Sequence, residues 1–318
     1  MKHSVILGLL LAGHLSLNAT TTRPIIRFAN LAEGKTLVIS NNAAKGPFDI
    51  QSRLGKIDGT LEELQTFQQA QVGEFTPAEC DSVNKSWHRL FDDIERQGLR
   101  LPLPDTITMV KTTQLEEGGA AAYTQGDVVF LNNRTMMAPG HWREMLLAHE
   151  LFHTLTRNNS DFRRHMYNLI GFTVLDEDVV FPEDVWARRI TNPDVERHNS
   201  YVMLPYEGRN TPHAMLLMAN RPYEGGSFFK YLAISLIPLT TDYKVMTDQQ
   251  GNTIVRPLEE VPEFWEKVGR NTDYVIDPEE CLADNFAYAV TGYRERDLPV
   301  LPNPELTEAI LSLAQSAK

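Results

Sequence analysis

The sequence has few cysteines, no long apolar run beyond its N-terminal region and a deficit of basic residues. Its 318 residues include 2 cysteines, which excludes a scaffold held together by several disulfides. No later stretch approaches the roughly 18 consecutive apolar residues that a membrane-spanning helix needs. The 30 Lys and Arg against 42 Asp and Glu give a formal net charge of −12. This charge argues against nucleic acid or an anionic membrane as a partner.

The composition is typical of a globular protein, with 42% hydrophobic and 23% charged residues. The first nineteen residues resemble a secretory signal peptide. Lys2 and His3 precede an apolar run from Val5 to Leu17, and Ala19 stands before a threonine-rich segment. We therefore expect removal of residues 1–19 and a mature protein that is exported, either periplasmic or extracellular.

The two cysteines, Cys80 and Cys281, leave two interpretations open. An exported protein meets oxidising conditions, under which the two thiols can form a disulfide. Alternatively, Cys281 lies in an apolar helical segment and packs there as a small buried hydrophobic residue.

The most informative stretch is His-Glu-x-x-His, formed by His149, Glu150 and His153. Two histidines four residues apart share one face of a helix and can bind the same metal ion. Residues 146–148 and 154–155 around the motif are almost entirely apolar, so the helix is expected to be buried. Burial of these side chains without a partner would cost on the order of several kcal/mol, which a bound cation offsets. The alternative is an ordinary helix with two histidines on its polar face.

A later acidic helix supplies candidates for a third ligand, because zinc in catalytic sites takes three protein ligands and one water. Asp277 is typical of an N-cap and Pro278 of a first helical residue. Glu280 and Asp284 lie four residues apart and face the same way. One of them can bind the metal while the other accepts the ring N–H of a histidine ligand. Glu279 is the alternative ligand, although an acid at a helix N-terminus is also favoured by the helix dipole.

The two motifs together, His-Glu-x-x-His and the later Glu-x-x-Ala-Asp that begins at Glu280, resemble the gluzincins, the thermolysin-like zinc metallopeptidases. The resemblance implies that His149, His153 and Glu280 bind Zn²⁺ and that Glu150 is the general base. It also implies an α+β zincin-like fold, with a small antiparallel sheet before the active-site helix, and a peptide or protein substrate. The close match covers only these two short helical segments.

The metzincin pattern does not fit, because it needs Gly at position 156 and His at position 159. This chain has Thr156 and Asn159 there, which excludes a third histidine ligand of that kind.

The remaining chain is expected to divide into a mostly helical region at 20–101 and a catalytic domain at 102–318 with a β-rich insertion at about 199–257. Whether the first region acts as a propeptide is left open by the sequence. The small residues 119–122 either let a substrate backbone approach an edge strand or form a flexible hairpin. Strands are expected at 37–40, 107–111, 120–123, 128–131, 201–205, 214–218, 228–239 and 253–255, and further helices at 60–70, 76–98, 161–169, 262–268 and 304–315.

The expected activity is that of a secreted zinc metallopeptidase, in which Glu150 takes a proton from a zinc-activated water. Gluzincins usually add a Tyr or His that donates to the oxyanion, and Tyr201, His213 and Tyr223 are the candidates. Two alternatives remain: a non-catalytic zinc-binding interaction module, and a metal-dependent hydrolase of a non-peptide amide. A structural zinc is usually closed by four protein ligands and has no use for Glu150 beside it.

Overall fold

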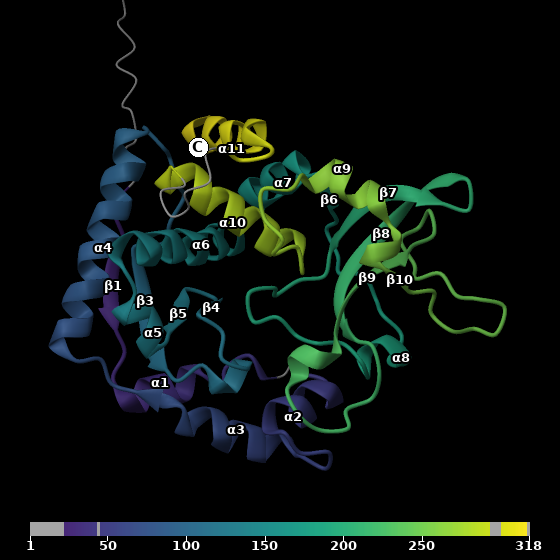
Figure 1. Ribbon diagram of the computed structural model, residues 1–318, viewed down its shortest axis with the longest axis horizontal. Helices are drawn as coiled ribbons and strands as arrows, with labels where there is room; N and C mark the ends of the chain where they lie inside the picture. Colours follow the sequence, from purple (N-terminus) through teal and green to yellow (C-terminus); the bar gives the residue numbers. More distant parts are fainter. Residues whose placement is uncertain (1–21, 43–44, 293–299, 317–318) are drawn as a thin grey trace, which may run out of the picture.

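The computed structural model describes residues 22–42, 45–292 and 300–316, so the predicted signal peptide at 1–19 lies outside the described residues. The fold is α+β, with two small sheets and helices that pack between and around them (Figure 1). Each sheet has five strands. The first sheet and the helices over it position the His-Glu-x-x-His motif, and the second sheet borders the same region from the other side (Figure 1).

The first sheet has the strand order β1 (Ile25–Phe28), β3 (Thr106–Thr112), β5 (Val128–Leu131) and β4 (Ala122–Gln125), with the short β2 (Val72–Gly73) also paired to β3. The expectation of an antiparallel sheet is wrong, because β1 and β5 both run parallel to β3. The β4–β5 hairpin places β5 between β3 and β4, and in this sheet β4 and the short β2 run antiparallel to their neighbours. In the described part of the chain β4 is therefore an edge strand.

The helix that carries the motif, α6 (Gly140–Asn158), lies between two long helices. On one side is α4 (Pro77–Arg96), which begins at the predicted capping box formed by Thr76 and Glu79. On the other side is α10 (Pro278–Thr291), which begins at the N-cap Asp277. The three helices share one apolar core with the first sheet. Its members include Trp87, Leu90, Phe91, Leu147, Leu151, Phe152, Leu282 and Phe286.

The second sheet is fully antiparallel and contains β6 (Phe172–Val174), β7 (Ser200–Tyr206), β8 (Arg209–Ala219), β9 (Leu232–Pro238) and β10 (Arg256–Pro257) in sequence order. The strands expected at 201–205 and 214–218 lie within β7 and β8. The strand expected at 253–255 is wrong, because Thr253 forms only an isolated bridge to Thr247 and β10 follows it. The first part of the strand expected at 228–239 is a short 3-10 helix, Phe228–Tyr231.

The strand expected at 37–40 is also wrong, because α1 (Leu31–Leu37) ends there. The Asn30 side chain accepts a hydrogen bond from the Glu33 N–H and starts this helix, and Val38 is buried beside Val110 of β3. Tertiary packing thus buries Val38 although this residue is not part of a strand. The other helices are α2 (Pro47–Leu54), α3 (Leu61–Ala70), α5 (Asn133–Met137), α7 (Ser160–Leu169), α8 (Glu183–Trp186), α9 (Trp265–Val268) and α11 (Pro304–Ser316).

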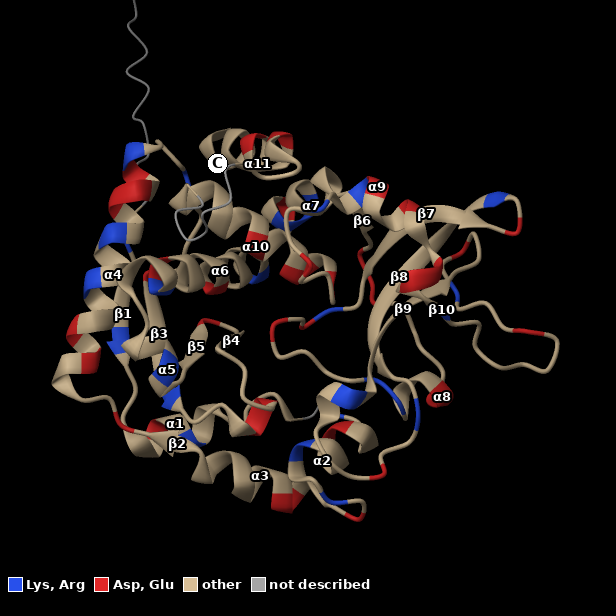
Figure 2. Cartoon of the chain, in the orientation of Figure 1, with Lys and Arg blue, Asp and Glu red and all other residues tan. Residues whose placement is uncertain are grey.

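Both cysteines are free thiols, so the disulfide interpretation is wrong, and Cys281 is buried as a small core residue. Basic and acidic residues are interspersed along α4, at the left of Figure 2. Among the described residues, no helix combines the length and the apolar character that crossing a bilayer requires.

Candidate metal centre

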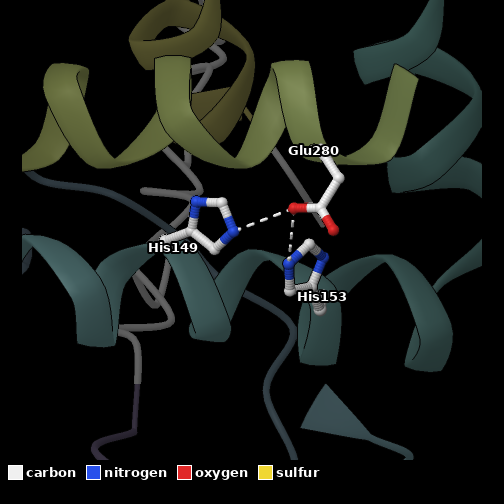
Figure 3. A group of neighbouring side chains, drawn as sticks. All are labelled: His149, His153 and Glu280. Carbon is white, nitrogen blue, oxygen red and sulfur yellow. Dashed lines mark hydrogen bonds and ion pairs between the residues drawn. The ribbon is translucent and has the colours of Figure 1, made fainter. Parts of the chain in front are cut away.

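The two histidines of the motif lie one turn apart on α6 and point towards the first turn of α10 (Figure 3). Their ring centroids are 4.9 Å apart. The Nε2 atom of His149 is 3.0 Å from the Oε2 atom of Glu280, and the Nε2 atom of His153 is 3.6 Å from the same oxygen. The structure thus brings together the three residues that the resemblance indicates as ligands.

The donor set fits a divalent metal ion. Two ligand atoms at tetrahedral positions, each about 2.0–2.1 Å from zinc, lie about 3.3 Å apart, close to the observed separations. The Nε2 atom of His153 is buried and has no hydrogen-bond partner among the described residues. An orphaned imidazole nitrogen inside a protein is costly unless a cation or a proton donor meets it. His149, His153 and Glu280 therefore form a site of the right chemistry and size for a metal.

Each imidazole ring is oriented by a carboxylate on its other nitrogen. The Nδ1 atom of His149 donates to Asp284 at 2.9 Å, and the Nδ1 atom of His153 donates to Glu279 at 3.1 Å. We assign both Nδ1 protons from these carboxylate partners, which leaves the two Nε2 lone pairs directed at Glu280. The geometry disfavours Glu279 as the metal ligand, because its carboxylate is hydrogen-bonded to the Nδ1 atom of His153, on the side of the ring away from Glu280.

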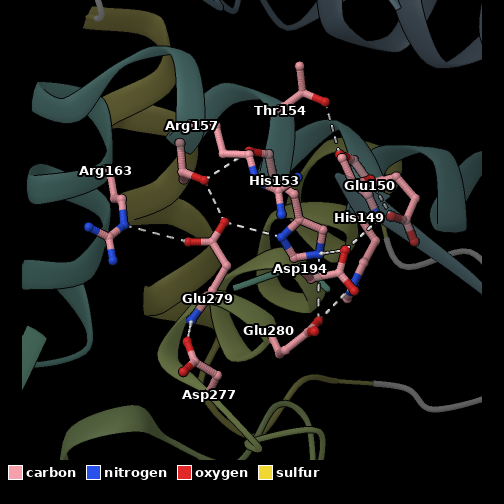
Figure 4. A network of polar contacts seen from close by, with 12 residues as sticks. His149, Glu150, His153, Thr154, Arg157, Arg163, Asp194, Asp277, Glu279 and Glu280 are labelled. Carbon is pink, nitrogen blue, oxygen red and sulfur yellow. Dashed lines mark hydrogen bonds and ion pairs between the residues drawn. The ribbon is translucent and has the colours of Figure 1, made fainter. Parts of the chain in front are cut away.

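Glu279 is the centre of a buried hydrogen-bond network (Figure 4). Besides His153, its carboxylate accepts hydrogen bonds from the hydroxyl groups of Thr156 at 2.5 Å and Tyr167 at 2.7 Å. The guanidinium of Arg163 lies 4.0 Å away. Burial raises the pKa of the Glu279 carboxyl, but the bonds from His153 and its neighbours outweigh burial and lower the pKa overall. Glu279 is thus held as an anion behind His153.

The metal-free site favours an additional proton on His149. Burial lowers the pKa of His149, but its hydrogen bonds to Asp284 and Glu280 outweigh burial and raise that pKa well above its usual value. A cation bound at the Nε2 atom supplies the positive charge that this proton would otherwise supply. The electrostatics of the pocket therefore select positive charge at the place where a metal would lie.

A further carboxylate, which the sequence analysis did not indicate, enters the site from the segment before β7. The Oδ1 atom of Asp194 is 3.8 Å from the Nε2 atom of His153. Asn192, two residues before Asp194, donates a hydrogen bond to Glu280 through its side-chain amide. Neither residue has a signal in the sequence, because a single Asp or Asn in a loop next to a Pro is typical of an ordinary turn.

The Glu150 carboxylate is buried on the same side of α6 as the two histidines. Its Oε2 atom accepts a hydrogen bond from the Thr124 hydroxyl of β4 at 2.6 Å. Burial raises the pKa of Glu150, while the charges of His149 and His153 partly oppose this shift. A carboxyl with a raised pKa beside a metal site can accept a proton and return it.

A cavity of about 380 Å³ opens beside His149 and Glu150. Its walls are mostly apolar and come from both halves of the fold. They include Ala121, Trp142, Met145, Leu146, Leu217, Phe228, Phe229 and Ile276.

The three predicted oxyanion donors do not line this cavity. The hydroxyl of Tyr201 lies 3.4 Å from that of Tyr243, His213 is bonded within the second sheet, and Tyr223 donates to the Gly226 carbonyl. The cavity wall instead contains Tyr274, whose ring centroid is 6.1 Å from that of His149.

The Tyr274 side chain is partly exposed, with 42% of the residue accessible, and its phenol keeps its proton at neutral pH. Burial of part of the ring and the negative charges of Glu280 and Asp194 raise the pKa of its phenol well above the usual value. Tyr274 precedes the α10 N-cap by three residues, a position that the sequence analysis did not single out.

The family model of the eCIS core domain matches residues 110–161. The matched segment runs from within β3 to the start of α7 and contains both histidines and Glu150, but not Glu280. The match covers a minor part of the chain, so this chain is similar to that domain over the segment from β3 through α6. No curated protein and no solved structure matches the chain.

Proposed function

We propose that this protein is a secreted zinc-dependent metallopeptidase of the gluzincin type, with Glu150 as general base. The observation that carries the proposal is the convergence of the Nε2 atoms of His149 and His153 on the Oε2 atom of Glu280, next to the buried Glu150. The segment that is similar to the eCIS core domain, residues 110–161, contains His149, Glu150 and His153.

In this proposal His149, His153 and Glu280 hold the metal, and Asp284 and Glu279 keep the two rings in the required tautomer. When bound, zinc supplies Lewis acidity, which polarises a substrate carbonyl and lowers the pKa of a water molecule.

Proton transfer belongs to Glu150 and Tyr274. Glu150 takes the proton of the attacking water and returns it to the leaving amine, while the Thr124 hydroxyl keeps its carboxylate in place. The protonated phenol of Tyr274 donates to the oxygen on which negative charge develops.

The apolar cavity beside Glu150 is the proposed binding site for a substrate side chain. Walls formed by Met145, Leu146, Phe228 and Ile276 favour a large aliphatic or aromatic group, because transferring such a group from water gives about 1.5–3 kcal/mol. We therefore expect cleavage next to large apolar residues and weak cleavage next to charged residues.

A second candidate function is a non-catalytic zinc-binding module. It is favoured by Asp194, because a fourth protein donor is typical of a closed structural zinc site. The buried Glu150, which is not needed in such a site, favours the peptidase.

The test is a time course by mass spectrometry of a mixed peptide library incubated with the zinc-loaded protein. Glu150→Gln removes the general base and retains the ligands. Glu144→Gln is the matched control, since Glu144 lies on the same helix but binds Arg89 of α4. We expect cleavage next to large apolar residues by the wild type and the control. Glu150→Gln should lose at least about 100-fold in rate. Equal rates for all three proteins would refute the proposed role of Glu150.

A further inference from the structure

We propose that Asp194 is a fourth metal ligand and that the segment 193–196 blocks the substrate position, so that the described conformation is a latent form of the enzyme. This inference rests on the proposed function. The Oδ1 atom of Asp194 is 3.8 Å from the otherwise unpartnered Nε2 atom of His153, and Glu150, His153 and Asp194 have ligand atoms within 4.8 Å of one another. Figure 4 shows the Asp194 carboxylate between His153 and Glu150.

Asp194 lies at the coordination position that a catalytic zinc site must leave open for water. A catalytic site has three protein ligands and a water in the fourth position. His149, His153 and Glu280 are the three, and Asp194 approaches His153 from the side on which Glu150 lies. A carboxylate there takes the place of the water that Glu150 would deprotonate.

The same segment covers the free edge of β4. The N–H of Thr124 donates to Asp194 Oδ1 at 2.6 Å, and the N–H of Gly126 donates to Glu196 Oε1 at 3.1 Å. Thr124 lies in β4, and Gly126 lies in the turn that follows this strand. An extended peptide that added to β4 would need these donors. Side chains of the protein therefore satisfy the backbone groups with which a substrate would pair.

The segment is held in this position by buried charged groups. The Thr191 N–H donates to Asp49 at 2.9 Å, and the Thr191 carbonyl accepts from Arg53 at 2.7 Å. Further along, Arg157 of α6 donates to the Pro193 carbonyl at 3.1 Å. Asp49 and Arg53 lie on α2, so the N-terminal part of the chain contributes directly to the blocked arrangement.

The experiment compares wild type, Asp194→Asn and Glu196→Gln after loading with Co²⁺, whose visible absorption reports the number and type of ligands. Asn retains a carbonyl oxygen that accepts the Thr124 N–H but is a weak metal ligand. Glu196→Gln is the matched control, because it alters the same segment on the side of Gly126 and Arg157. Zinc affinity is measured in parallel by competition with a chelator, and acetohydroxamate is added to each Co²⁺ form.

We expect Asp194→Asn alone to change the Co²⁺ spectrum, to weaken zinc binding at least about tenfold and to respond to acetohydroxamate at lower concentration than wild type. Peptide cleavage should rise in the same variant.

Identical spectra, zinc affinities and hydroxamate responses for wild type and Asp194→Asn would overturn the proposal. The readouts separate this proposal from the peptidase. If Asp194→Asn opens the metal site and no protein cleaves peptides, Asp194 is the ligand and the proposed peptidase function fails. If wild type cleaves as fast as Asp194→Asn and the spectra agree, the peptidase stands and the latent form is refuted.

Discussion

His149 and His153 belong to one motif, yet their rings are held differently. His153 is fully buried, and its partner Glu279 is itself bound by two hydroxyl groups. The partner of His149 is Asp284, which accepts from Thr272 and remains partly exposed. The motif therefore has one rigid and one more accessible ligand, and the accessible ligand faces the cavity.

Glu279→Gln is expected to weaken zinc binding about 10- to 100-fold, because the neutral amide no longer fixes the tautomer of His153 or raises its basicity. Chelator competition at neutral pH measures the change. Glu305→Gln is the control, since Glu305 also lies in the first turn of a helix, α11, but far along the chain and bonded to Asn303. Equal zinc affinity for Glu279→Gln and wild type would show that Glu279 does not position His153.

The sequence could indicate His149, His153, Glu280 and Asp284 because helical spacing is a local property. Two residues four apart share a face whatever the rest of the fold does. Asp194 could not be found in this way. It reaches the site through the path of a loop, and that path is set by tertiary contacts such as those of Thr191 with α2. Tyr274 was missed for the same reason, since only the fold places it on the cavity wall.

The elements were predictable to the extent that their own residues determine them. The capping box at Thr76 predicted the start of α4, and a run of β-type residues after a turn predicted β5. Pairing is a property of two strands, so the parallel arrangement of β3 and β5 and the contribution of β1 had no local signal. The strand expected at 37–40 was wrong because the apolar residues there pack at the end of a helix.

The second sheet contains a neutral histidine that makes it sensitive to acid. His213 of β8 is fully buried. Its Nδ1 atom donates to the Thr211 carbonyl, and its Nε2 atom accepts a hydrogen bond from Arg256 of β10. Protonation of Nε2 would remove the acceptor and place two cations together. Burial, with a further contribution from Arg256, lowers the pKa of His213 to about 4.

Stability is therefore expected to fall as the pH drops from about 6.5, the usual pKa of an unfolded histidine, towards about 4, the pKa in the folded protein. In this interval the unfolded chain binds the proton and the folded chain does not. The loss attributable to His213 is up to about 3 kcal/mol at the acid end.

Urea unfolding at pH 7 and pH 4.5 measures this pH dependence for wild type and His213→Gln. Gln does not titrate, so its free energy of unfolding should change less between the two pH values. His165→Gln is the control, because His165 is exposed on α7. An equal pH dependence for His213→Gln and wild type would contradict the assignment.

At the scale of the whole molecule, one buried charged cluster joins the N-terminal helix α2 to the segment between β3 and β4 and to the loop before β7. Arg53 of α2 pairs with Asp49 at 2.5 Å and with Glu117 at 2.7 Å, and Lys45 pairs with the same Glu117 at 2.8 Å. Arg53 also donates to the Thr191 carbonyl, and β1 belongs to the first sheet. The structure therefore ties residues from the 20–101 region into the fold that holds the metal site.

Arg53→Met is expected to reduce the free energy of unfolding by about 3–5 kcal/mol, because it leaves the buried carboxylates of Asp49 and Glu117 without their shared cation. Arg27→Met is the matched control. Arg27 also pairs with a glutamate, Glu33, but at the surface, where such a pair contributes less than about 1 kcal/mol. Urea unfolding measures both, and equal small losses would show that the cluster does not hold the N-terminal helices to the rest of the fold.

Because Arg53 also anchors Thr191, we expect the Co²⁺ spectrum of Arg53→Met to move towards that of Asp194→Asn, whereas Arg27→Met should retain the wild-type spectrum.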